Sequence, residues 1–161
     1  MLLIAWHGRT GASEAMAQAA FAGAQEAGEG AVRLVPASQV TPDDFLSAGG
    51  CLFVCPENLA TMSGMMKEMF DRCYYPVLGR IEGRPYATII AAGSDGSGAQ
   101  AQIDRIAKGW RLKRVADPIT VNFEAQTPEA ILADKQVPEI VIEQCRDLGA
   151  ALSEGLSLGV F

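Results

Sequence analysis

The first thirteen residues, MLLIAWHGRTGAS (1–13), organise the rest of the chain. Residues 2–6 are an unbroken apolar run, which is typical of a strand buried on both faces because it lacks polar alternation. Residues 8–13 then supply two glycines, two hydroxyls and one cation. An alanine-rich helix is predicted over 14–27, with Ser13 at or near its N-cap. Because partial positive charge gathers at a helix N-terminus, this turn predicts an anion site suited to a phosphate ester.

Length and charge restrict the classes of protein that fit. A chain of 161 residues predicts one domain with one core. The formal net charge of −6 argues against a nucleic-acid partner, since phosphate backbones require a basic stripe and the basic residues here are scattered. The N-terminal apolar run is too short to span a membrane, and no basic segment precedes it. We therefore expect a cytoplasmic protein without a membrane span.

The cysteines predict neither disulfides nor a metal site. Cys51 and Cys55 lie four residues apart in a predicted strand, which separates them by about 13 Å at ~3.3 Å per residue, too far for a bridge. No close-spaced set of Cys and His residues is present, so metal binding is not expected. We interpret all four cysteines (Cys51, Cys55, Cys73 and Cys145) as small buried hydrophobes in a reducing compartment.

The remaining chain alternates apolar strands with amphipathic helices. Further strands are predicted at 31–35, 51–55, 86–92 and 119–123, with 112–115 as another candidate. One helix is predicted over 99–109. Three others are predicted to start near Thr41-Pro42, at Ser63 and near Pro138. This alternation indicates right-handed βαβ units. The fold class is therefore α/β: a flavodoxin-like three-layer sandwich with a five-stranded parallel sheet of order 2-1-3-4-5 and helices on both faces.

Several local expectations accompany this fold. Pro56 is expected to end the third strand, and residues 57–62 to form a loop. Ser63 is expected to cap a helix, and residues 74–76 and 79–85 to form a polar link after it. Residues 124–137 are a polar stretch before the last helix. The apolar stripe of the helix that starts at Ser63 is predicted to contain Met65, Met66, Met69, Phe70 and Cys73.

Three loops, 7–13, 56–63 and 93–98, follow strands and are therefore expected at the carboxyl edge of the sheet, where ligands bind in such folds. The first resembles the flavodoxin phosphate loop, in which hydroxyl-x-Thr-Gly-x-Ser/Thr wraps the phosphate of FMN. It keeps Thr10, Gly11 and Ser13 but has Gly8 where the family usually has a hydroxyl. Arg9 supplies charge that could compensate for the missing contact.

The second and third loops strengthen the resemblance. Residues 56–67, PENLATMSGMMK, followed by Phe-Asp-Arg at 70–72, resemble the NAD(P)H:quinone oxidoreductases of the tryptophan-repressor-binding-protein type. They resemble the NADPH-dependent FMN reductases more loosely. Residues 93–100, GSDGSGAQ, resemble the glycine-rich ring-binding loop of that family. The resemblance covers about residues 1–110, with the three motifs in the family's order.

The resemblance implies FMN as cofactor, NAD(P)H as electron donor and a quinone or similar small acceptor. Because the chain lacks the longer insertions of the quinone oxidoreductases, we expect a homodimer rather than their tetramer. The cofactor, rather than a catalytic side chain, would carry the redox chemistry at its N5 atom. The implied cofactor-binding residues are Gly8, Arg9, Thr10, Gly11, Ala12, Ser13, Pro56, Glu57, Asn58, Leu59, Ala60, Thr61, Gly93, Ser94, Asp95, Gly96 and Gly98.

The residues themselves support a flat ligand. Gly93, Gly96 and Gly98 lack a Cβ, so their backbone could approach a ring closely, and backbone groups of 57–61 and 93–97 could address its polar atoms. His7 is the only histidine, so no Ser/His/Asp or Cys/His set is available. It is interpreted either as a hydrogen-bonded turn residue or as part of the site.

Two other functions fit the same pattern. An acidic flavodoxin-type electron carrier would dock on basic redox partners, although few aromatic residues stand at the ring loops. A cofactor-free interaction module is the other alternative, and Gly8 in place of a hydroxyl favours it. Leu59 stands where the family often has a stacking aromatic residue, and Asn58 where it often has Arg.

Overall fold

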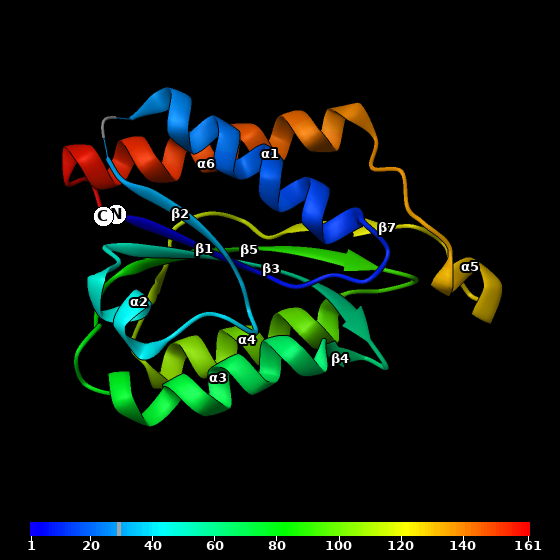
Figure 1. The fold of residues 1–161 in the computed structure, drawn as a ribbon, viewed down its shortest axis with the longest axis horizontal. Helices are drawn as coiled ribbons and strands as arrows, with labels where there is room; N and C mark the ends of the chain where they lie inside the picture. The colour runs from blue at the N-terminus through cyan, green and yellow to red at the C-terminus, as the bar shows by residue number, and fades with distance from the viewer. Residues whose placement is uncertain (29) are drawn as a thin grey trace.

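The computed structural model describes residues 1–28 and 30–161, which form three layers (Figure 1). The strands are β1 (Leu2–Trp6), β2 (Val32–Pro36), β3 (Gly50–Asn58), β4 (Thr61–Met62), β5 (Pro85–Ala92), β6 (Lys113–Arg114) and β7 (Ile119–Asn122). The helices are α1 (Ala12–Ala27), α2 (Pro42–Ser47), α3 (Gly64–Val77), α4 (Ser97–Gly109), α5 (Pro128–Leu132) and α6 (Glu139–Leu158). Helices α1 and α6 cover one face of the sheet, and α2, α3 and α4 lie on the other.

The sheet confirms the predicted strand order, but among the described residues it has seven strands rather than the five predicted, and β4 pairs with β3 in antiparallel orientation. Its order is β2-β1-β3-β5, with β6 and β7 both pairing with β5 in parallel. The main strands therefore follow the order 2-1-3-4-5. Every residue of β5 is buried, as are Leu2 to Ala5 of β1, which agrees with their continuous apolarity. One core packs α1 and α6 against the sheet, and a second packs α2, α3 and α4 against its opposite face, so the sheet divides the single core that was expected into two.

The third strand is longer than predicted. Strand β3 continues through Pro56 to Asn58 and turns back as β4, with Glu57 opposite Met62 in an antiparallel pair. Proline lacks an N–H, but its carbonyl oxygen still accepts the N–H of Ser63 across the hairpin. The expectations that Pro56 ends the strand and that residues 57–62 form an irregular loop are therefore wrong.

Two helix starts also differ from expectation. Helix α1 begins at Ala12 with Gly11 as its N-cap, so Ser13 lies inside the first turn and does not cap the helix. Ser63 is the N-cap of α3 as predicted, but its side chain makes no capping hydrogen bond. Gly11 takes the cap position because its φ of 87° is one that glycine adopts without strain.

Helix α3 is also longer than its predicted apolar stripe. It runs through residues 74–76 to Val77, so the expected polar link at that place is wrong. Pro76 lies in the last turn of α3, where its missing N–H removes one hydrogen bond to the preceding turn. Met65 is 40% exposed and does not belong to the buried stripe, which begins at Met66.

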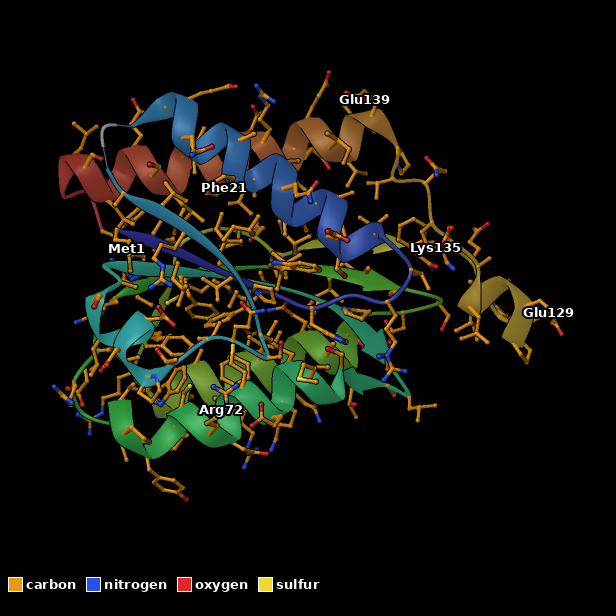
Figure 2. All side chains as sticks on the ribbon, in the orientation of Figure 1. Met1, Phe21, Arg72, Glu129, Lys135 and Glu139 are labelled. Atoms are coloured by element: carbon orange, nitrogen blue, oxygen red, sulfur yellow. The ribbon has the colours of Figure 1, made fainter. Side chains whose placement is uncertain are left out.

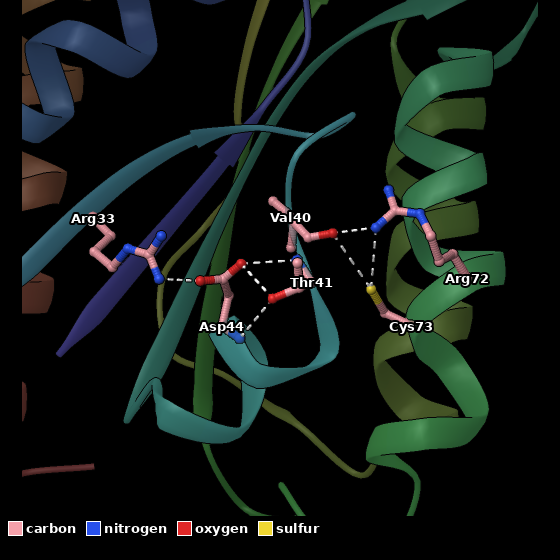
Figure 3. A network of polar contacts seen from close by, with 6 residues as sticks. All are labelled: Arg33, Val40, Thr41, Asp44, Arg72 and Cys73. Atoms are coloured by element: carbon pink, nitrogen blue, oxygen red, sulfur yellow. Dashed lines mark hydrogen bonds and ion pairs between the residues drawn. The ribbon is translucent and has the colours of Figure 1, made fainter.

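A polar network holds α2 between β2 and α3 (Figure 3). Thr41 and Asp44 form a capping box at the start of α2. The Asp44 carboxylate also pairs with Arg33 of β2, and Arg72 of α3 donates to the carbonyl oxygen of Val40. These contacts fix the layer that covers the second core.

The polar stretch at 124–137 contains the short helix α5, which was not predicted. The Thr127 hydroxyl caps it by accepting the N–H of Ala130 at 3.2 Å. All four cysteines are free and buried, as predicted. Within the part of the chain that the structure describes, none of the helices has the length and apolarity needed to cross a bilayer.

Candidate functional site

The turn between β1 and α1 holds a buried hydroxyl that forms no hydrogen bond with any of the described residues. Ser13 is 2% exposed, and its Oγ has no hydrogen-bond partner among the described residues. An unpaired buried hydroxyl costs about 1–3 kcal/mol, so native proteins seldom retain one without a ligand or water. The atom lies in the first turn of α1, where helix N–H groups favour an anion. The predicted phosphate site therefore has a polar group available for it.

Gly8 lies directly against this serine. A Cβ added at Gly8 would lie 3.1 Å from the Cβ of Ser13 and 3.7 Å from its Oγ. A side chain at this position would crowd the free hydroxyl unless the turn shifted. Glycine at position 8 therefore allows the turn to pack closely against Ser13.

His7 joins this first turn to the start of α3. Its backbone N–H donates to Val54 at 2.9 Å, and its Nδ1 lies 2.9 Å from the Oγ of the fully buried Ser63. Burial and the nearby Arg9 guanidinium both lower the pKa of His7, because each disfavours the imidazolium form. The interpretation of His7 as a hydrogen-bonded turn residue is confirmed. The contact also explains why the Ser63 hydroxyl does not cap α3.

The second loop is a tight hairpin with an exposed apolar tip. Leu59 and Ala60 have φ values of 53° and 60°, so two successive L-residues adopt the left-handed conformation. That conformation costs roughly 1–2 kcal/mol for each residue that carries a Cβ. Leu59 is 98% exposed at this tip. Such strain persists only where surrounding contacts enforce it, and it often marks functional sites.

The hairpin is fixed to the third loop. The Glu57 carboxylate accepts the N–H of Gly96 at 2.9 Å and the N–H of Ala99 at 3.0 Å. The Gln102 side-chain oxygen accepts the N–H of Met62 at 2.9 Å. The second and third loops therefore form one continuous wall at the carboxyl edge.

The glycines of the third loop serve a different purpose from the one expected. A Cβ at Gly93 would lie 2.7 Å from the Ala125 carbonyl oxygen, and one at Gly98 would lie 2.1 Å from that of Ala60. Gly96 has a φ of 95°, and its Cβ position is 2.6 Å from a methyl group of Thr120. Protein atoms, rather than a flat ligand, occupy the space that these glycines leave. The expectation that these glycines make room for a flat ring is therefore wrong.

A fourth segment, residues 124–137, joins the same edge and was missed by sequence reasoning. The Ala125 N–H donates to Gly93, and the Lys135 N–H donates to Thr10, each at 2.8 Å. The Asn122 side chain donates to the Ser94 carbonyl oxygen at 2.7 Å. In Figure 2, Lys135 lies on the connection between α5 and α6. The only sequence signal was its length, because long connections without predicted structure are often functional loops.

Together these contacts bring the predicted loops to one edge, at the right in Figure 1. Ala12, Ser13 and Gly96 are buried within it, whereas Arg9 and the hairpin tip are exposed. Two open cavities, of about 310 and 440 Å³, lie elsewhere, the first near Gly49 and Phe161 and the second between β7 and α6.

The strand order and the loops gathered at this edge define a flavodoxin-like fold. More specifically, the chain belongs to the NADPH-dependent FMN reductase family, whose model matches residues 36–123. The predicted family resemblance is thereby confirmed, and membership implies FMN as the cofactor.

Relatives agree with this fold. A flavodoxin from Aquifex aeolicus (strain VF5) is 27% identical over 164 residues, which cover 99% of this chain and 88% of the relative. A solved flavodoxin from the domain Archaea has a TM-score of 0.77 at 15% identity, with 96% of this chain and 97% of that chain covered. Rubredoxin oxygen:oxidoreductase from Desulfovibrio gigas has a TM-score of 0.78 at 11% identity. That match covers 99% of this chain but 36% of the other protein.

Proposed function

We propose that this protein is an FMN-dependent oxidoreductase that takes electrons from NAD(P)H and passes them to a quinone or a similar small acceptor. The observation that carries this proposal is the buried Ser13 hydroxyl in the first turn of α1, which has no hydrogen-bond partner among the described residues. That hydroxyl, together with the helix N-terminus, suits the phosphate of FMN. Family membership supports the oxidoreductase class and the cofactor.

The proposed site has a phosphate end and a ring end. At the phosphate end, the Thr10 and Ser13 hydroxyls and the N–H groups of the first turn would bind the phosphate, with Arg9 adding positive charge. At the ring end, residues 56–61 and 93–98 would line the isoalloxazine, with Leu59 exposed to cover it. The Glu57 carboxylate and the Gly96 N–H are bound to each other, so the other groups of these two loops would address the ring.

FMN would supply the redox chemistry, accepting a hydride from the nicotinamide and returning two electrons to the acceptor. Overall, NAD(P)H, one proton and a quinone would yield NAD(P)+ and a hydroquinone. The chain itself would bind and orient the reactants. Free, buried cysteines favour a reducing compartment, so we propose that the protein acts in the cytoplasm.

A second candidate is a flavodoxin-type electron carrier. The Aquifex aeolicus flavodoxin matches 99% of this chain, which favours this alternative. The net charge of −6 would also suit docking to basic redox proteins. The two functions differ in their use of NAD(P)H.

Purified protein tests these proposals. We expect a yellow protein with flavin absorbance near 450 nm, rapid NAD(P)H oxidation when a quinone is added, and release of FMN on heating, identified by mass spectrometry. A flavin-loaded protein that is inert to both nicotinamides but exchanges electrons rapidly with a reductase would establish the carrier instead. If millimolar FMN neither raises the melting temperature nor loses fluorescence on mixing, the chain is a cofactor-free module.

A further inference from the structure

The Glu57 carboxylate fills the N-terminus of α4 from another part of the chain. Helix α4 begins after Gly96 and has no side-chain cap of its own. Glu57, from the end of β3, accepts N–H bonds from Gly96 and Ala99 at 2.9 and 3.0 Å. A carboxylate at this position satisfies backbone donors that the helix leaves unpaired and is favoured by the helix dipole.

We propose that Glu57 is a positioning residue that latches the β3–β4 hairpin onto α4 and so shapes the ring end of the flavin site. This inference rests on the proposed function. It assigns Glu57 an action through the hairpin, rather than direct contact with the ring.

The strained tip shows why a latch is needed. Leu59 and Ala60 hold positive φ values that short-range preferences disfavour. The Ala60 carbonyl oxygen lies so close to α4 that only glycine fits at position 98, where a Cβ would be 2.1 Å away. Gln102 of α4 holds the other side of the hairpin through Met62. Glu57 therefore adds charged hydrogen bonds at the point where the strained turn meets the helix.

The latch also separates the two ends of the site. Because Glu57 already occupies the N-terminus of α4, that helix end is closed to a ligand phosphate. The phosphate is left to α1 and the free Ser13 hydroxyl. Loss of the latch should therefore weaken binding of the flavin ring without changing recognition of the phosphate.

Titration of the apoprotein with FMN and with riboflavin, which lacks the phosphate, separates these effects. We expect Glu57→Gln to raise the dissociation constants of both ligands by about tenfold, because one charged hydrogen-bond pair is broken. The ratio of the two constants should stay at the wild-type value. Ser13→Ala should raise the constant for FMN alone. Asp43→Asn, which removes an exposed carboxylate from the first turn of α2, is the matched charge control and should change neither.

Gly98→Ala offers a second route to the same result, since its Cβ would lie 2.1 Å from the Ala60 carbonyl oxygen and 3.3 Å from the Glu57 carboxylate and would push the hairpin off α4. Wild-type affinity for both ligands in Glu57→Gln, or a loss confined to FMN, would overturn the latch. Failure of the wild-type protein to bind either ligand would instead refute the proposed function. If the variants do not fold, hydrogen exchange in the wild type decides: the Gly96 and Ala99 amides should be protected, and exchange at the rate of free loop amides would overturn the proposal.

Discussion

Ser13 illustrates how a single side chain can be placed correctly by sequence and yet be misread. The order of strand, glycine-rich turn and helix places it at a helix start, but its hydroxyl does not cap α1. Gly11 takes the cap position because its φ of 87° suits glycine, and this leaves the Ser13 hydroxyl buried and unpaired. Backbone conformation at one residue therefore changes the role of another.

Replacement of Ser13 by alanine should have opposite effects on the free and the FMN-bound protein. Removing an unsatisfied buried hydroxyl should leave the apoprotein equally stable or more stable by up to about 1 kcal/mol. Losing a hydrogen bond to a charged phosphate should raise the FMN dissociation constant by about tenfold or more. Urea unfolding and fluorescence titration measure the two effects. Ser38→Ala, at an exposed position, is the control, and unchanged FMN affinity in Ser13→Ala would contradict the phosphate role.

His7 should make the stability of the protein depend on pH. Since the folded protein lowers the pKa of His7, the unfolded chain binds more protons once the pH falls below about 6.5. The His7 contribution to the free energy of unfolding should thus be constant above that pH and decrease below it. Urea unfolding from pH 8 to pH 5 should show a steeper decrease for wild type than for His7→Gln, which does not titrate. If the free energies of unfolding of wild type and His7→Gln change in parallel with pH, His7 does not contribute to the pH dependence of stability.

The elements at the carboxyl edge are joined by contacts between residues far apart in the chain. Pro56 was read as a strand terminator because proline lacks an N–H, but the carbonyl of Pro56 and the hairpin after it extend the strand. The segment at 124–137 is held through backbone bonds to Gly93 and Thr10. Local propensity contains no information on such partners, so the hairpin and this fourth segment could not be predicted.

Gly93→Ala tests the corrected role of the third-loop glycines. A Cβ at Gly93 would meet the Ala125 carbonyl oxygen at 2.7 Å, so the variant should lose about 1–3 kcal/mol of stability even without ligand. Gly64→Ala is the matched control, because nothing lies within 4 Å of its Cβ position at the start of α3. That variant should gain about 0.5–1 kcal/mol. Wild-type stability of Gly93→Ala apoprotein, measured by urea unfolding, would restore the view that this glycine accommodates a ligand.

The hairpin tip should trade stability for binding. Asparagine followed by glycine is the preferred pair where two successive residues need positive φ. Replacing Leu59 by Asn and Ala60 by Gly should therefore stabilise the apoprotein by about 1 kcal/mol. It should also weaken riboflavin binding, because the exposed leucine would no longer cover the ring. Thermal unfolding measures the stability of the double variant, and titration measures its affinity for riboflavin. A gain in stability without a loss of affinity would show that Leu59 does not contact the ring.

For the molecule as a whole, the positions of the main strands could be predicted from residues that act locally, and the alternation of strands and helices then indicated the parallel sheet and its strand order. Apolar runs at 2–6, 51–55 and 86–92 mark strands, and Gly8 and Gly93 mark the turns after the first and the last of them, whereas Pro56 does not end the second. The family assignment rested on three short motifs and is confirmed by the match over residues 36–123. What each site residue contacts depends on the packing of four separate segments, which no single motif encodes. The homodimer stays a prediction, which sedimentation velocity of the purified protein tests.

A crystal structure of the protein grown with FMN would examine the whole proposal in one measurement. The phosphate should lie within hydrogen-bonding distance of the Ser13 hydroxyl, at the N-terminus of α1, with the ring against residues 57–61 and 93–97. Glu57 should remain bound to α4. Density for FMN at another place, or a Ser13 hydroxyl still without a partner at saturating FMN, would contradict the proposed site.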